Sequence, residues 1–169
     1  MLRIVGALMV ISCCSIIGMG YAGGLRARKK NLAGFIAALT VMRSEICDLL
    51  TPMPELLERM AGQTEPPIKQ FFINCLSFMK MQMPFSKAWE KAVRETAGLE
   101  LYTEEIFCLC RLGMLLGRYE VEEQRVAITR TIVRLEEFHR RAGEDMAGRG
   151  KVCAAMGISA GLMIAIIMI

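Results

Sequence analysis

Two long stretches without a charged residue, one near each end, constrain this chain more than any other feature. Ile4–Leu25 runs for 22 residues without a charge, and Val152–Ile169 runs for 18. An α-helix rises about 1.5 Å per residue and needs about 20 apolar residues to span a bilayer. We therefore predict one transmembrane helix within residues 1–25 and another at residues 152–169, with residues 26–151 forming the domain between them.

The charges beside these stretches predict their orientation. Cations follow the first stretch and precede the second: Arg26, Arg28, Lys29 and Lys30, then Arg140, Arg141, Arg149 and Lys151. Positive charges near membrane spans are retained on the cytoplasmic side. The pattern predicts a protein of the cell membrane with two spans and a cytoplasmic domain between them.

A cleaved signal peptide is the alternative interpretation of the first stretch. Gly20, Tyr21 and Ala22 form a small-x-small sequence of the kind that precedes cleavage. The apolar stretch is longer than a normal signal core, and the cations directly after it oppose export. We therefore favour the membrane span.

Both predicted spans contain glycines four residues apart. Gly20 and Gly24 lie in the first, and Gly157 and Gly161 in the second. This spacing lets helix backbones approach closely in lipid, so these glycines are candidates for membrane helix packing. The alternative is that glycine is simply common in membrane helices.

Composition excludes several classes of protein. Hydrophobic residues make up 54% of the chain and charged residues 22%, and the apolar excess lies at the two ends. A freely soluble enzyme, a disulfide-rich secreted miniprotein and a disordered tail do not combine these values. The net charge of +4 comes without a basic run interleaved with aromatic residues, so we expect no nucleic-acid partner.

The seven cysteines are predicted to be reduced, structural thiols. They form no CxxC pair, and His139 is the chain's one histidine, so the spacing typical of a zinc site is missing. We expect neither a metal nor another cofactor.

Residues 26–151 show helical periodicity and no strand pattern, which predicts an all-α bundle of about six helices. Apolar residues recur at steps of three and four in the first helix, at Leu32, Phe35, Leu39, Met42, Ile46 and Leu49. Prolines and glycines divide the rest into predicted helices at Pro54–Met60, from Pro66-Pro67 to before Pro84, from Ser86 as N-cap to Gly98, from Thr103 to Gly117, and from Val121 to Gly148.

No catalytic motif emerges from the sequence. Phosphate-binding loops and serine-nucleophile motifs are missing, and the acidic pairs Glu122-Glu123 and Glu136-Glu137 point about 100° apart on a helix. We therefore expect no catalytic residues and no enzymatic activity. A membrane-bound enzyme with an unrecognised site is the alternative.

Several segments together resemble the stage III sporulation protein AB family of endospore-forming bacteria. They are Leu39–Ile46, Thr51–Pro54, Phe85–Trp89 and Leu112–Gly117, set between an apolar segment with a basic exit and a long helix that leads into the second apolar segment. The resemblance runs from end to end. One departure is Arg118-Tyr119-Glu120, where family members often carry Asp, and it leaves a role for an acid at that turn in doubt.

This resemblance implies a non-enzymatic membrane platform. Family members are similar to the helical-bundle cytoplasmic domains of type II secretion F and type IV pilus platform proteins. The implied location is the mother-cell membrane, in a channel complex facing the forespore, beside a secretion-type ATPase encoded as the AA component. The alternative is an F-type platform of a secretion or pilus system, although such proteins usually repeat the bundle and have a third span.

The implied partner needs a contact surface, and the acidic starts of two helices are the candidates. Glu104 and Glu105 open the predicted fifth helix, and Glu122 and Glu123 open the sixth. We predict that these residues contact the ATPase. The alternative is an ordinary solvated helix surface.

Overall fold

The structure, a computed structural model, is all-helical. It describes the backbone of residues 2–117 and 120–168 and the side chains of residues 23–117 and 120–147. Six helices and no strand occur in this part of the chain: α1 (Leu2–Cys47), α2 (Met53–Gln63), α3 (Ile68–Lys80), α4 (Phe85–Glu95), α5 (Thr103–Leu115) and α6 (Val121–Met168). The predicted all-α class and its number of helices are confirmed.

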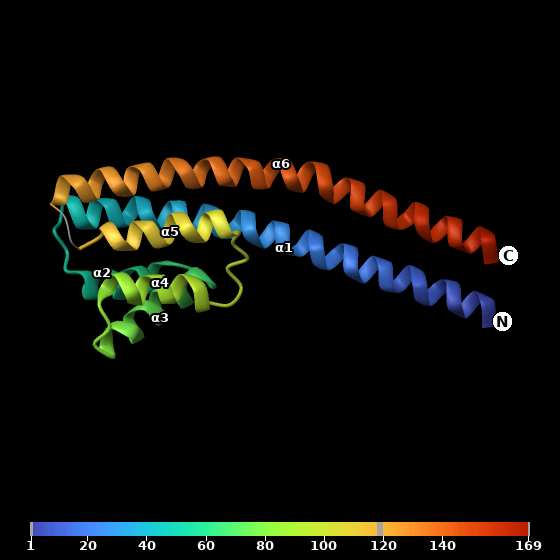
Figure 1. Ribbon diagram of the computed structural model, residues 1–169, viewed down its shortest axis with the longest axis horizontal. Helices are drawn as coiled ribbons and strands as arrows, with labels where there is room; N and C mark the ends of the chain where they lie inside the picture. Colours follow the sequence, from blue (N-terminus) through green and yellow to red (C-terminus); the bar gives the residue numbers. More distant parts are fainter. Residues whose placement is uncertain (1, 118–119, 169) are drawn as a thin grey trace.

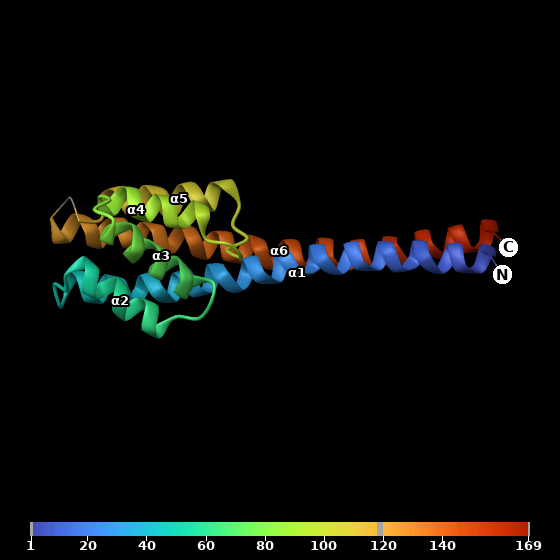
Figure 2. The ribbon, with the colours of Figure 1, turned by 90° about the horizontal axis from the view of Figure 1, so that it is seen from below.

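The helices form a long two-helix hairpin with four short helices at one end. The two long helices α1 and α6 lie side by side, and both chain ends lie at the far end of this pair (Figures 1 and 2). The short helices α2 to α5 pack around the other end, where α1 ends and α6 begins. The bundle is therefore joined to both terminal segments by unbroken helices.

The bundle core is built from the predicted apolar faces. Leu32, Phe35, Leu39 and Met42 of α1 are completely buried. Leu49 was expected to continue this stripe, and that prediction is wrong, because α1 ends at Cys47 and Leu49 is 63% exposed. The buried residues of this stripe face a set of aromatic rings on α3 and α4.

Those rings pack edge to face around Trp89. Its ring centroid lies 4.8 Å from that of Phe71, which in turn lies 5.4 Å from Phe35. Trp89 is fully buried, and its Nε1–H donates to the carbonyl oxygen of Leu109 at 2.9 Å. Burial therefore leaves the polar atom of the ring with a partner, as a stable core requires.

Two segments that carry the family resemblance meet in this core. Gly113 on α5 lies against the Trp89 side chain, so that a Cβ at Gly113 would be 2.3 Å from Trp89 Cδ1. The helices α4 and α5 approach this closely because glycine has no side chain. A glycine at this position is thus required by the ring opposite it.

A third resemblance segment secures the end of α1. The Glu45 carboxylate accepts hydrogen bonds from the Thr51 hydroxyl at 2.7 Å and from Arg59 Nη1 at 2.9 Å. These bonds join α1, the following loop and α2. The hydrogen bond from Thr51, with that from Arg59, holds the pKa of Glu45 below its usual value.

The predicted helix boundaries need three corrections. Ser86 lies inside the first turn of α4, where the Pro84 carbonyl accepts the first helical bonds, so Ser86 is not the N-cap. This helix ends at Glu95, and Gly98 lies in the loop beyond it with a φ of +81°. The second helix extends to Gln63, three residues past its predicted end. Gly117 follows α5 as predicted, with a φ of +74° that favours glycine.

The sixth helix buries the expected stripe along most of its described length. Ile128, Leu135 and Ala142 have no exposed surface, whereas Val121, predicted to be part of the stripe, is 37% exposed. The helix continues without a break to Met168.

The membrane prediction falls largely on residues whose side chains the structure does not describe. Within the described residues, no helix has a stretch apolar and long enough to cross a bilayer. The predicted spans, residues 1–25 and 152–169, lie outside the described side chains except for residues 23–25, as do Gly20, Gly157 and Gly161. The two spans remain predictions.

Candidate functional site

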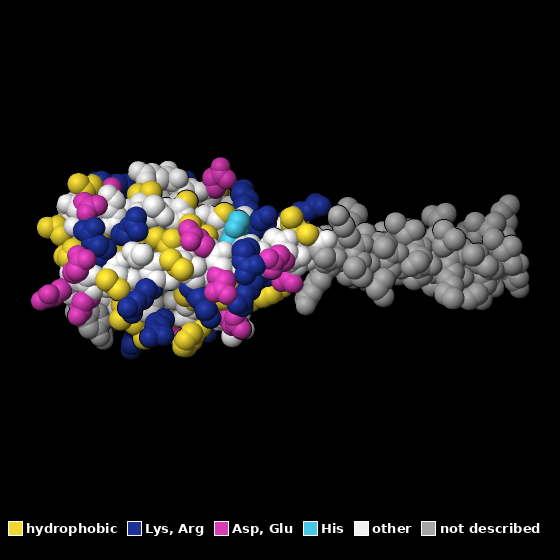
Figure 3. Space-filling model, turned by 90° about the horizontal axis from the view of Figure 1, so that it is seen from above, with side chains coloured by type: hydrophobic (Ala, Val, Ile, Leu, Met, Phe, Trp, Pro, Cys, Tyr) yellow, Lys and Arg dark blue, Asp and Glu magenta, His cyan; other side chains and the backbone are white. Residues whose placement is uncertain are grey.

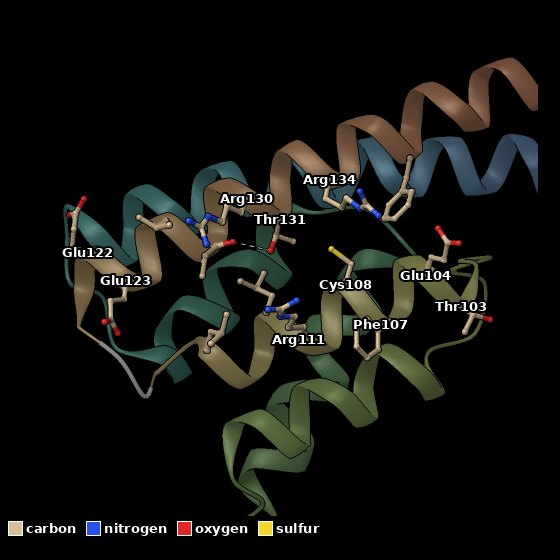
Figure 4. A pocket seen from close by; sticks show the side chains of 15 residues that line it. Thr103, Glu104, Phe107, Cys108, Arg111, Glu122, Glu123, Arg130, Thr131 and Arg134 are labelled. Carbon is tan, nitrogen blue, oxygen red and sulfur yellow. Dashed lines mark hydrogen bonds between the residues drawn. The ribbon is translucent and has the colours of Figure 1, made fainter.

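A groove between α5 and α6 brings most of the predicted acidic patch together. These helices run antiparallel, and the groove between them has a volume of about 1160 Å³. Glu104 lies at one end, and Glu122 and Glu123 lie at the other (Figure 4). All three side chains are exposed. Three of the four acids predicted as one patch therefore lie at the two ends of one groove.

Glu105 does not belong to this surface, which corrects the predicted patch. It has no exposed surface, and its Oε1 accepts hydrogen bonds from Arg28 Nε at 2.9 Å and Arg28 Nη2 at 2.5 Å. Its Oε2 accepts the backbone N–H of Tyr102 at 2.7 Å, which secures the start of α5. Glu105 is the third residue of α5, and its side chain turns back toward Tyr102, the residue before the helix. It therefore points inward, whereas its neighbour Glu104 points out.

Arg28 also departs from its predicted role. It was expected to be one of the cations beside the membrane, but it is buried where α1, α5 and α6 meet. Its guanidinium lies 3.7 Å from the centre of the Tyr102 ring, and its Nη1 is 3.6 Å from Asp145 Oδ2 on α6. Burial alone would lower the pKa of Arg28, but hydrogen bonding and charge from Glu105 raise it. Arg28, which lies on α1, thus connects this helix to both α5 and α6.

The walls of the groove are more apolar than charge patterns alone suggested. Phe107 on α5 is 65% exposed and Val126 on α6 is 41% exposed, and both line the groove. Sequence reasoning missed these residues because it assigned each helix a single inward face. The signal that was available is that Phe107 and Val126 are apolar residues outside the inward face of their helices.

Charges of both signs surround these apolar residues. Viewed from the α6 side, acidic and basic side chains are interspersed over the bundle, with hydrophobic side chains exposed between them (Figure 3). Most of the α6 charges pair with each other or with α1. Arg125 binds Asp48 at 3.1 Å and Glu122 at 3.3 Å, while Glu137 pairs with both Arg134 and Arg141.

The residues that suggested chemistry are not brought together. Among the described side chains, no three His, Cys, Asp or Glu residues are arranged to hold a metal ion. His139 is partly buried on α6, apart from the residues that line the groove. The groove therefore offers contacts for a partner and no metal-ligand set within the described part of the chain.

The described cysteines are free thiols. Cys75 and Cys110 are buried, and Cys47 and Cys108 are partly buried. Burial raises the pKa of all four, that of Cys75 to about 12. A thiol with so high a pKa is almost entirely protonated at neutral pH and is a poor nucleophile. For these four residues, the predicted structural role is confirmed; Cys13, Cys14 and Cys153 lie outside the described side chains.

Three comparisons with known proteins lead to the same family. A family model described as stage III sporulation protein AB matches residues 3–169. Stage III sporulation protein AB of Bacillus subtilis (strain 168) is 24% identical over 170 residues, covering 99% of this chain and 99% of that protein. A solved structure of stage III sporulation protein AB matches with a TM-score of 0.66 and 23% identity, covering 71% of this chain and 96% of that chain. The structural match shows a shared helical fold.

Proposed function

This chain belongs to the stage III sporulation protein AB family, and on that premise we propose that it is a non-enzymatic platform in the mother-cell membrane. In this role it couples a cytoplasmic secretion-type ATPase, the AA component of the same system, to the membrane subunits of a sporulation channel complex. The bundle faces the mother-cell cytoplasm, and the two terminal segments anchor it.

The observation that carries this proposal is the unbroken course of α1 and α6 from the bundle to the two chain ends (Figures 1 and 2). A helix of 46 residues such as α1 is about 69 Å long. Because both helices belong to the bundle and also extend past it, a displacement of the bundle reaches both terminal segments directly. Buried Arg28 strengthens this connection, since it joins α5 to α1 and α6.

The proposed contact surface for the ATPase is the pair of acidic groove ends. Glu104 and Glu123 are exposed and form no ion pair with another described residue, so their charges are available to a partner. Glu122 already pairs with Arg125 at 3.3 Å. The charges of Glu104 and Glu123 are therefore the ones to reverse.

Reversing both charges is expected to weaken the ATPase complex without unfolding the bundle. In Glu104→Lys/Glu123→Lys, co-purification of the AA ATPase with the full-length, detergent-solubilised protein should fall by at least about tenfold, because like charges at a contact repel. The control is Glu58→Lys/Glu136→Lys, which changes the net charge equally at exposed positions outside the groove. Unchanged co-purification in the first variant, or an equal loss in the control, would remove the acidic ends from the proposed contact.

The proposed orientation predicts where a cysteine reagent can reach. Gln63 at the end of α2 is exposed, so Gln63→Cys should react with a membrane-impermeant maleimide only after the mother cell is permeabilised. Native Cys75 should stay unlabelled in both conditions because it is buried with a pKa of about 12. Labelling of Gln63→Cys in intact cells would place the bundle away from any cytoplasmic ATPase and refute the platform proposal.

A further inference from the structure

The two walls of the α5–α6 groove repeat one residue pattern. Each wall has an exposed apolar residue followed four positions later by an arginine: Phe107 and Arg111 on α5, and Val126 and Arg130 on α6. A step of four places each pair on one face of its helix. Phe107 is 65% exposed and Val126 is 41% exposed. The two helices thus present matching pairs, an apolar side chain and a cation, to the groove.

The two central arginines have no acidic partner in the described part of the chain. Arg111 and Arg130 are exposed, lie on opposite walls and project into the middle of the groove (Figure 4). Neighbouring arginines on α6 behave differently, since Arg125 and Arg134 pair with Asp48 and Glu137. Two unpaired cations that share one groove repel each other, and a carboxylate between them would offset that repulsion.

The ends of the groove have the opposite charge. Glu104 precedes Arg111 by seven residues on α5, and Glu123 precedes Arg130 by seven on α6, a separation of about 10 Å along each helix. Because the helices are antiparallel, the two acids lie at opposite ends. Arg134 and Glu122 also line the groove, but each is paired, with Glu137 and Arg125. The charges without an ion pair are therefore negative, positive and negative along the groove, with apolar residues between them.

We propose that this groove binds an amphipathic helix of a partner protein that is acidic at its centre and basic about two turns away on either side. A groove between two antiparallel helices accepts a third helix by ordinary side-chain packing, with the partner's apolar face on Phe107, Leu115 and Val126. This inference deepens the proposed function, on which it rests for the role of the bundle as a docking platform, by naming the chemistry of the docked segment.

The same charges disfavour two other occupants. A second copy bound through this face by two-fold symmetry would bring the central arginines of the two copies together. A phosphate-rich ligand that filled the groove would meet Glu104 at one end and Glu123 at the other. A helix that alternates basic, acidic and basic charge satisfies all four groups at once.

The test is a selection that uses the full-length protein in detergent. A phage library displays amphipathic helical peptides of about 18 residues, with the central polar position and the positions seven residues to either side varied among Glu, Gln and Lys. We expect Glu at the centre to be enriched at least tenfold over Lys, and Lys to be enriched over Glu at both flanking positions.

Reversing the central charges supplies the matched comparison. In Arg111→Glu/Arg130→Glu the central preference should switch from Glu to Lys, while Lys69→Glu/Lys87→Glu, two exposed positions on α3 and α4, should leave it unchanged. The proposal is overturned if no peptide binds, if Glu and Lys are recovered equally, or if the preference persists after the reversal. It is also overturned by a dimer in detergent that Phe107→Asp separates, which would assign the groove to a second copy.

This selection contains no ATPase, so its outcome is separate from that of the proposed function. Loss of ATPase co-purification in Glu104→Lys/Glu123→Lys together with a failed selection would retain the platform and refute the helix-binding groove. A successful selection with undiminished ATPase binding would retain the groove and assign its helix to another subunit.

Discussion

Arg28→Met is expected to lower the free energy of unfolding by about 3–5 kcal/mol, because it leaves the Glu105 carboxylate buried without its cation. The side chains of Arg28 and Glu105 are only 5% and 1% exposed, so water cannot replace the lost hydrogen bonds. The loss should appear in urea unfolding of the full-length protein in detergent, followed by the fluorescence of Trp89, the chain's one tryptophan. Glu105→Gln should lower the free energy of unfolding by a similar amount, since it leaves the Arg28 guanidinium buried without its carboxylate.

Two further variants separate the buried charge from other effects. Arg28→Met/Glu105→Gln should lower the free energy of unfolding by clearly less than the two single losses added together, because it leaves neither a buried arginine nor a buried carboxylate without its partner at this site. Lys30→Ala, which breaks the exposed pair with Glu65, should leave stability almost unchanged. Additive losses in the double variant would show that packing around Arg28, and not its charge, holds α5 to the long helices.

Gly113→Ala is expected to destabilise the bundle by about 1–3 kcal/mol, although alanine is the better helix former. The new methyl group would lie 2.3 Å from Trp89 Cδ1 and 3.0 Å from Trp89 Cβ. The ring cannot move aside easily, because it is fully buried among Phe71, Phe72 and Phe85 and its Nε1–H is bonded to Leu109. A shift in the Trp89 emission maximum should accompany the loss in urea unfolding.

Gly34→Ala is the matched control for this clash. Its new methyl group would also lie 2.3 Å from a neighbouring atom, but that atom is the terminal Cδ1 of Ile68, which can rotate away. We therefore expect a much smaller loss of stability, which the higher helix propensity of alanine partly offsets. Equal losses at Gly34 and Gly113 would mean that helix spacing in general, and not the rigid tryptophan, sets the cost.

These two predictions concern the connection on which the platform proposal depends. The Arg28–Glu105 pair joins α5 to the long helices, and the contact of Gly113 with Trp89 joins α4 to α5. A displacement applied to the α5 wall of the groove therefore reaches α1 through the Arg28–Glu105 pair, whereas α6 is itself the other wall and is displaced directly. Variants that keep the bundle folded but loosen these contacts are the means of separating partner binding from coupling.

Periodicity and helix-breaking residues were enough to predict the class of fold. Prolines at positions 52, 66 and 84 and the glycine at 117 separate the helices because they remove backbone donors or adopt a φ that other residues avoid. The buried faces of α1, α3 and α4 followed from apolar residues at steps of three and four, and the structure confirms Phe35, Phe71 and Trp89 in the core. These are local properties, which a sequence carries explicitly.

The errors arose where a local pattern had more than one structural outcome. Glu104 and Glu105 are neighbours and equally acidic, yet one faces the groove and the other is buried against Arg28, 77 residues away. Arg28 lies within a run of cations that resembles a membrane flank, and α5 and α6 turn it into a core residue. No residue near Arg28 in the sequence indicates that it is buried, because its partners belong to helices that contact it only after folding.

By itself, then, the sequence determined the helices, their apolar faces, the family and the expectation of two terminal spans. Tertiary structure alone decided which charges are buried, that α5 and α6 enclose a groove, and that Arg111 and Arg130 share it without an acidic partner among the described residues. The physical reason is the distance along the sequence between the residues that interact. Helix formation depends on residues within one or two turns, whereas burial of a charge depends on the distance to a partner that only the packing of other helices brings close.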